Sequence, residues 1–132
     1  MLVPTLRPFL SSAQLLSLLS SADGEEGRFF HQKFNALVNL IDSMPVTYEQ
    51  DGKGDDAMVY LHYFSARCDW YITEKDIDGG VEQAFGFAII NGDRQNAELG
   101  YISIAELVRH NVELDLHFTP CKLGDIKTRL AA

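Results

Sequence analysis

The fold of this chain is decided by the stretch Gly54-Asp55-Asp56-Ala57-Met58-Val59-Tyr60-Leu61-His62-Tyr63-Phe64. Its two aspartates form an acidic turn, and Ala57–Phe64 then carries apolar side chains on both alternate faces. Such a strand is typical of the centre of a sheet, where both faces are covered. A second strand is predicted over Asp69–Thr73, and it runs into another acidic turn at Glu74. These two strands predict where the core of the fold lies.

Three further strands are predicted downstream. Gln83–Ile90 and Glu98–Ile102 are rich in apolar residues, and Asn91-Gly92 after the first of them is a strong turn signal. Val112–Phe118 alternates between apolar and polar residues, which predicts an antiparallel strand with one face in water. Its inward positions are expected to be Val112, Leu114, Leu116 and Phe118.

Helical periodicity dominates the first third of the chain. One helix is predicted over Ala13–Ser20 and a second over Arg28–Asp42, where Pro45 prevents further extension. Ser103-Ile104-Ala105-Glu106 is a capping box that predicts a short helix, and a last helical turn is expected over Asp125–Leu130. The apolar stripe of the first helix is expected to comprise Leu15, Leu16, Leu18 and Leu19.

This order of elements predicts an α+β fold, in which an antiparallel sheet of about five strands has helices packed on one face. The length of 132 residues predicts one domain over 1–132. Within it, residues 1–48 form an N-terminal helical segment and residues 54–120 form the sheet core.

The net charge of −8 arises entirely between Asp42 and Glu98, where twelve carboxylates face four Lys and Arg. An acidic surface repels phosphates, so direct binding to nucleic acid is not expected. The apolar runs are shorter than the roughly 20 residues of a membrane helix, so no membrane partner is expected either. Cys68 and Cys121 lack metal-binding spacing and are expected to be reduced thiols in a cytoplasmic protein.

Several short elements follow one another in a fixed order: Leu2-Val3-Pro4, Gly54–Val59, Trp70–Glu74, Phe85-Gly86-Phe87, Glu98–Ser103 with Glu106-Leu107, and Asp115–Phe118. This ordered set resembles the domain-of-unknown-function family 2958 across roughly residues 50–120. The resemblance implies an association with bacterial plasmids and integrative elements, and it implies no catalytic residues. The segment Phe29–Met44 departs from the family pattern and resembles an enlarged insert.

Two groups of residues contain side chains of the types that bind metal ions. Glu74–Gly79 begins like a calcium-binding loop, but the position of the bidentate glutamate is Phe85, so an acidic turn is the better interpretation. His62, Asp115 and His117 supply ligand types that bind zinc or iron, although their spacing is not that of a metal motif. They form the alternative prediction of a small metal-dependent enzyme or of a ligand pocket near the two histidines.

The leading prediction is a non-enzymatic protein-interaction module without a cofactor, monomeric or homodimeric, that binds a host or element-encoded protein. An acidic surface with aromatic anchors suits protein recognition. One form of this hypothesis is an anti-restriction protein or DNA mimic, whose carboxylates replace phosphates. The predicted interaction face comprises Asp55, Asp56, Tyr63, Asp69, Tyr71, Glu74, Asp76 and Asp78.

Overall fold

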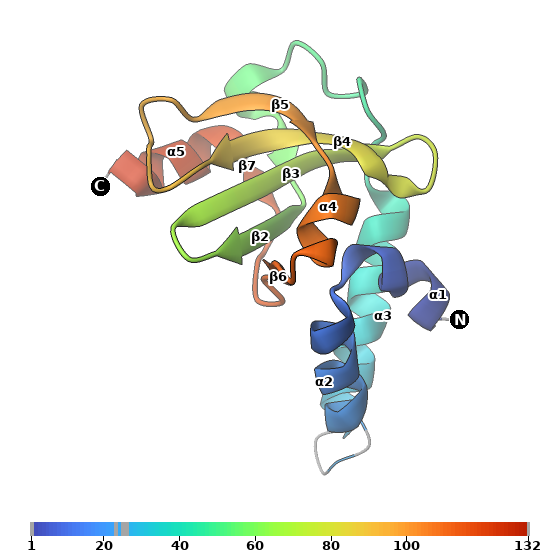
Figure 1. The fold of residues 1–132 in the computed structure, drawn as a ribbon. Coiled ribbons are helices and arrows are strands. Elements are labelled where there is room, and N and C mark those ends of the chain that lie inside the picture. Colours follow the sequence, from blue (N-terminus) through green and yellow to red (C-terminus); the bar gives the residue numbers. More distant parts are fainter. Residues whose placement is uncertain (1, 23, 25–26, 132) are drawn as a thin grey trace.

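A five-stranded antiparallel sheet lies at the centre of the computed structural model, which describes residues 2–22, 24 and 27–131 (Figure 1). The expected α+β fold, with a sheet of five strands and an N-terminal helical segment, is confirmed. In spatial order the strands are β5 (Glu98–Ile102), β4 (Gly80–Ile89), β3 (Cys68–Asp76), β2 (Leu61–Ser65) and β6 (Glu113–Leu114).

The predicted strand over 57–64 is divided at Tyr60. After β1 (Met58–Val59), the Tyr60 N–H donates to the Ile72 carbonyl (2.9 Å), and the chain then continues as β2. β1 leaves the main sheet and pairs with β7 (Cys121–Lys122) in a separate two-stranded ladder. The apolar residues of 57–64 therefore belong to two different sheets, β1 to the small one and β2 to the main one.

Four short elements form the N-terminal helical segment: α1 (Leu2–Leu6), the 3-10 helix η1 (Arg7–Phe9), α2 (Ser12–Ala22) and α3 (Gly27–Ser43). The Ser11 hydroxyl accepts the Gln14 N–H (3.2 Å) at the start of α2. The two predicted helices are therefore present, whereas α1 and η1 had no sequence prediction. Leu16 was wrongly placed in the apolar stripe of α2, since its side chain is exposed.

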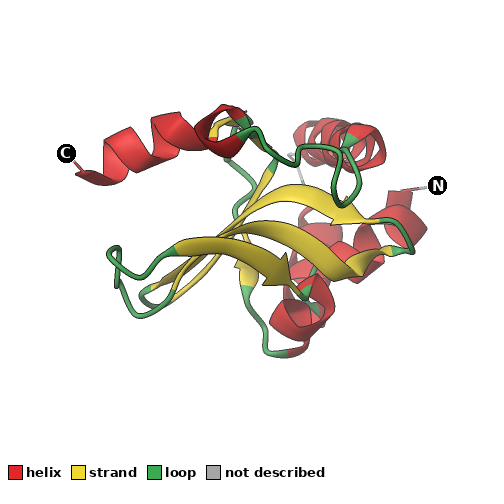
Figure 2. Cartoon of the chain, turned by 90° about the horizontal axis from the view of Figure 1, so that it is seen from above, coloured by secondary structure: helices red, strands yellow, loops and turns green. Residues whose placement is uncertain are grey.

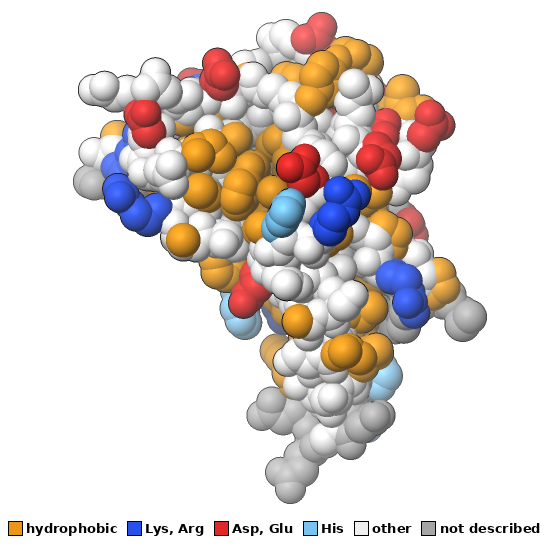
Figure 3. All heavy atoms as spheres, viewed as in Figure 1, with side chains coloured by type: hydrophobic (Ala, Val, Ile, Leu, Met, Phe, Trp, Pro, Cys, Tyr) orange, Lys and Arg blue, Asp and Glu red, His pale blue; other side chains and the backbone are white. Residues whose placement is uncertain are grey.

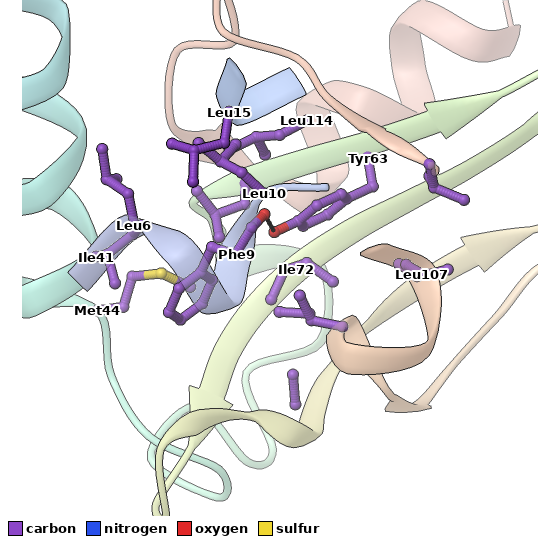
Figure 4. Packing of buried hydrophobic residues seen from close by; sticks show 14 of the residues in the cluster. Leu6, Phe9, Leu10, Leu15, Ile41, Met44, Tyr63, Ile72, Leu107 and Leu114 are labelled. Carbon is purple, nitrogen blue, oxygen red and sulfur yellow. Dashed lines mark hydrogen bonds between the residues drawn. The ribbon is translucent and has the colours of Figure 1, made fainter. Parts of the chain in front are cut away.

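The main core lies between these helices and one face of the sheet (Figure 4). Tyr63 is fully buried there, and its hydroxyl donates to the Phe9 carbonyl (2.6 Å), which joins β2 to η1. Burying a hydroxyl costs little when it has a partner, so the aromatic ring contributes its full apolar area. The buried residues drawn in Figure 4 include Leu6, Phe9, Leu10, Leu15, Ile41, Met44, Tyr63, Ile72, Leu107 and Leu114.

The two remaining helices lie on opposite faces of the sheet (Figure 2). α4 (Ile104–Arg109) joins the main core, and the Glu106 N–H donates to the Ser103 hydroxyl (3.1 Å), as the capping box predicted. α5 (Leu123–Ala131) covers the other face, so helices are present on both faces and not only on the expected one. The second core consists of Val59, Tyr71, Phe87, Ile89, Leu123 and Ile126.

The predicted strand over 112–118 is wrong beyond Leu114. β6 ends there because the Asp115 side chain accepts the His117 N–H (2.9 Å), and the Asp115 carbonyl accepts the Phe118 N–H (3.4 Å). An aspartate that binds the backbone two residues further on favours a turn over a ladder. Residues 115–120 consequently leave the sheet as a loop.

Candidate functional site

Two residues of the alternative metal site, His62 and Asp115, are in contact, and Asp69 contacts the same imidazole. His62 Nε2 lies 2.8 Å from Asp69 Oδ1, and His62 Nδ1 lies 3.2 Å from Asp115 Oδ2. The imidazole stacks on the Tyr71 ring with 4.5 Å between centroids. An imidazolium has two N–H donors and satisfies both carboxylates, whereas a neutral ring has only one donor. Both ring nitrogens are thus occupied by groups of the protein itself.

His117 does not complete this pair into a metal site. His117 donates its backbone N–H to Asp115, and it is exposed within the loop 115–120. Within residues 2–22, 24 and 27–131, no group of three or more His, Cys, Asp or Glu side chains is arranged to hold a metal ion. The geometry assigns His62 and Asp115 a structural role, because together they attach the loop 115–120 to β2 and β3.

The predicted aromatic part of the interaction face was wrong, because Tyr63 and Tyr71 are buried, with exposed fractions of 0% and 7%. Their strands pair so that Tyr63 lies opposite Trp70 and Tyr71 opposite His62, which places the two tyrosines on opposite faces of the sheet. Each face is covered by its own helices. Burial and the Asp69 carboxylate raise the pKa of Tyr71 to about 12.

The predicted acidic residues do not lie together either. Asp55 Oδ1 is 2.7 Å from Lys127 Nζ, and Asp56 Oδ1 is 3.7 Å from Lys122 Nζ, both beside α5. Asp69 belongs to the His62 cluster, and Glu74 is only 3% exposed. Asp76 ends β3 and Asp78 lies in the following turn. Acidic side chains are accordingly scattered over the sheet-bearing half of the molecule (Figure 3).

A different aromatic patch is exposed beside β5, and sequence reasoning missed it. Tyr48, Tyr101 and Leu99 have exposed fractions of 63%, 53% and 39%. The Tyr48 and Tyr101 hydroxyls are hydrogen-bonded, and the Tyr101 ring packs edge-on against Phe85 with 5.7 Å between centroids. The alternation of Leu99 and Tyr101 could have predicted that these two side chains share a face of the strand. No local pattern could have predicted Tyr48, because it comes from a loop far away in the sequence. We call Tyr48, Phe85, Leu99 and Tyr101 the edge patch.

The edge patch borders a hollow of about 140 Å³ whose lining includes two acidic residues, Asp51 and Glu74. Glu74 Oε1 accepts the Tyr48 N–H at 2.6 Å. Burial raises the pKa of Glu74, and this effect is partly offset by the amides of Tyr48 and Gln50. Gln50 holds the loop in place, since its side-chain amide donates to the carbonyls of Met58 and Thr73, each at 2.8 Å.

β5 itself is an edge strand of the sheet. It pairs with β4 on one side only, with Gly86 opposite Gly100 and Phe87 opposite Leu99. A strand in this position presents unpaired N–H and C=O groups along its outer side. The hollow, the edge patch and this free edge therefore adjoin one another at the β5 side of the sheet.

Comparison with protein-family models, with curated proteins and with solved structures found no match to this chain. The resemblance of residues 50–120 to a family of unknown function stays a prediction. None of the described helices is long and apolar enough to cross a membrane.

Proposed function

We propose that this chain is a non-enzymatic protein-interaction module that binds an extended, basic segment of another protein along β5. The observation that carries the proposal is the acidic hollow of Asp51 and Glu74 beside an unpaired strand edge and the edge patch. The family resemblance adds that the partner is a host protein or a protein encoded by the same mobile element.

The edge supplies the affinity of such a complex through the backbone. A partner strand added to β5 forms main-chain hydrogen bonds, and its alternate side chains select the sequence. On the face that carries Leu99 and Tyr101, apolar partner side chains pack against exposed rings. The partner remains extended because a ladder accepts only that conformation.

The hollow supplies the charge selectivity. A lysine or arginine of the partner that enters it places a cation beside Asp51 and Glu74, and a charge-assisted hydrogen bond is about twice as strong as a neutral one. Because Glu74 is desolvated, an incoming cation compensates an unfavourable buried charge. A glutamate at the same place in the partner would instead add a third carboxylate.

The DNA-mimic form of the hypothesis has less support. A phosphate mimic needs carboxylates that are free and aligned, whereas Asp55 and Asp56 face lysines and Asp69 faces His62. A metal-dependent enzyme has less support as well, because both nitrogens of His62 already face carboxylates. The β5 surface is the arrangement that favours recognition of a protein.

A peptide titration tests the proposal. The probe is a ten-residue peptide of alternating threonine and valine with a central arginine, and its matched control has glutamate at the centre. We expect saturable binding of the arginine peptide alone, with amide chemical-shift changes concentrated at Glu98–Ile102. Asp51→Asn should weaken this binding about tenfold, because a charge-assisted hydrogen bond is lost.

Asp78→Asn is the matched control variant, because Asp78 is exposed in a turn outside the hollow. It should bind the arginine peptide as the parent does. Equal binding of the two peptides, or shift changes confined to other strands, would contradict the proposal. Sedimentation of the free chain as a dimer that Leu99→Lys dissociates would also contradict it, since β5 would then be occupied by a second copy.

A further inference from the structure

A second concave surface lies away from β5, between α3 and the loop 115–120. This groove has a volume of about 430 Å³, within the range of about 300–1,000 Å³ that is usual for small-molecule sites. Phe30, Phe34 and Leu37 of α3 line one side, and Leu116 and Phe118 line the other. The walls are apolar, so an apolar ligand body is favoured there.

Lys33 is the only lysine or arginine among the described residues that line the groove. Its Nζ donates to the Leu116 carbonyl at 3.2 Å and lies 6.0 Å from the centre of the Phe29 ring. An ammonium has three N–H donors, so this hydrogen bond leaves two for a ligand. The position is therefore suited to an anionic group at the end of an apolar molecule.

The carboxylate in the groove wall does not cancel this preference. Asp115 Oδ2 faces His62 Nδ1 at 3.2 Å, and Asp115 Oδ1 accepts the His117 N–H at 2.9 Å. Both oxygens are thus already engaged by other groups of the protein. The side chain of Lys33 extends from α3 to the Leu116 carbonyl of the loop, so its ammonium lies at the groove.

We propose that this groove binds a medium-chain fatty carboxylate, with its chain between α3 and the loop 115–120 and its carboxylate on Lys33. At roughly 30 Å³ for each water-sized group, a volume of about 430 Å³ holds on the order of a dozen non-hydrogen atoms. Decanoate is a ligand of that size. The site shares no lining residue with the β5 hollow, so it does not depend on the proposed protein partner.

Calorimetric titration with decanoate, decan-1-ol and decylamine tests this assignment on the full chain. We expect one decanoate per chain and weaker binding of decylamine, whose charge repels Lys33. Lys33→Met keeps an apolar stem without the charge, so it should weaken decanoate binding about tenfold and change decan-1-ol binding less than about twofold. Lys53→Met, in an exposed loop outside the groove, should leave all three affinities unchanged.

Ala36→Trp provides a second variant if Lys33→Met does not fold, because Ala36 lines the groove but is exposed. The indole fills the groove and should abolish binding of both decanoate and decan-1-ol. The proposal is overturned by absence of saturable decanoate binding, by equal binding of decanoate and decylamine, or by decanoate binding that survives in Ala36→Trp. Occupation of the groove by an apolar peptide with no competition from decanoate also overturns it.

Discussion

Glu74 shows how one buried side chain holds a loop in place beside the proposed binding site. Its carboxylate accepts the Tyr48 N–H and thereby holds the loop that brings Tyr48 next to Tyr101. The same carboxylate is desolvated, and its pKa is raised from the ordinary 4.5. A raised folded-state pKa means that the folded chain holds the proton more tightly than the unfolded chain. The contribution of Glu74 to stability is therefore complete below its pKa in the unfolded chain. It is lost as the pH rises through its pKa in the folded chain.

Glu74→Gln should remove this pH dependence, because glutamine still accepts the Tyr48 N–H but carries no charge. We expect the free energy of unfolding of the variant, relative to the parent, to increase between pH 4 and pH 7. Urea unfolding at the two pH values measures the difference. Glu82→Gln, an exposed glutamate of β4, is the control and should show a constant difference. If the difference in free energy of unfolding between Glu74→Gln and the parent does not change with pH, Glu74 is not the source of the pH dependence.

At the scale of elements, β4 and β5 carry facing glycines with unequal surroundings. A Cβ at Gly86 would lie 2.1 Å from the Tyr71 carbonyl oxygen, whereas a Cβ at Gly100 would meet nothing within 4 Å. The chain therefore needs glycine at 86 for the close approach of β3 and β4. At Gly100 the missing side chain leaves open space on the sheet face that carries Ile72 and Ile102.

Gly86→Ala should destabilise the fold by about 3 kcal/mol or more, since backbone atoms must move to admit the methyl group. Gly100→Ala should change the free energy of unfolding by less than about 0.5 kcal/mol. The two residues face each other in the same ladder, so each controls for the other. Chemical denaturation of both variants measures the difference, and similar losses in the two would refute this account of β4.

At the scale of the whole molecule, the N-terminal segment closes one face of the sheet. Leu6, Phe9 and Leu10 are buried against it, and the Phe9 ring covers Gly80 at the start of β4. α3 adds Phe34 and Ile41 to the same core. The helices before residue 44 are thus part of the main core.

Phe9→Ala should cost about 3–5 kcal/mol, a large share of the roughly 5–15 kcal/mol that stabilise a typical domain. Leu16→Ala, in the exposed stripe of α2, should cost less than about 1 kcal/mol. Thermal unfolding followed by circular dichroism compares the two. A small effect of Phe9→Ala, or a cooperative transition that leaves the helices folded, would show that the N-terminal segment is not integral to the core.

Local patterns predicted most elements because periodicity and capping act within a few residues. The spacing of Phe34 and Ile41 identified α3, and Ser103 with Glu106 identified the start of α4. Patterns failed where a side chain competes with the backbone, as Asp115 does at the end of β6. They failed also at α1 and η1, which are too short for a period to emerge.

Which side chains of the predicted interaction face are exposed was harder to predict. The pairing register of the strands decides which residues share a face of the sheet. Alternation alone does not reveal that Tyr63 lies opposite Trp70, and this pairing decides which helices bury each tyrosine. His62, Asp115 and His117 were grouped as one alternative metal site, but only the side chains of His62 and Asp115 are in contact. Asp69 was grouped with the acidic face instead, although its carboxylate faces the imidazole of His62.

The amino-acid sequence by itself determined the α+β class, the positions of most strands and helices, and the confinement of excess negative charge to 42–98. These properties follow from short-range periodicity and composition. Only the tertiary structure decided that Tyr63 and Tyr71 are buried and that Tyr48 and Tyr101 are exposed together. Only it placed Lys33 across the groove between α3 and residues 115–120. The physical reason is that burial and proximity depend on contacts between segments far apart in the chain.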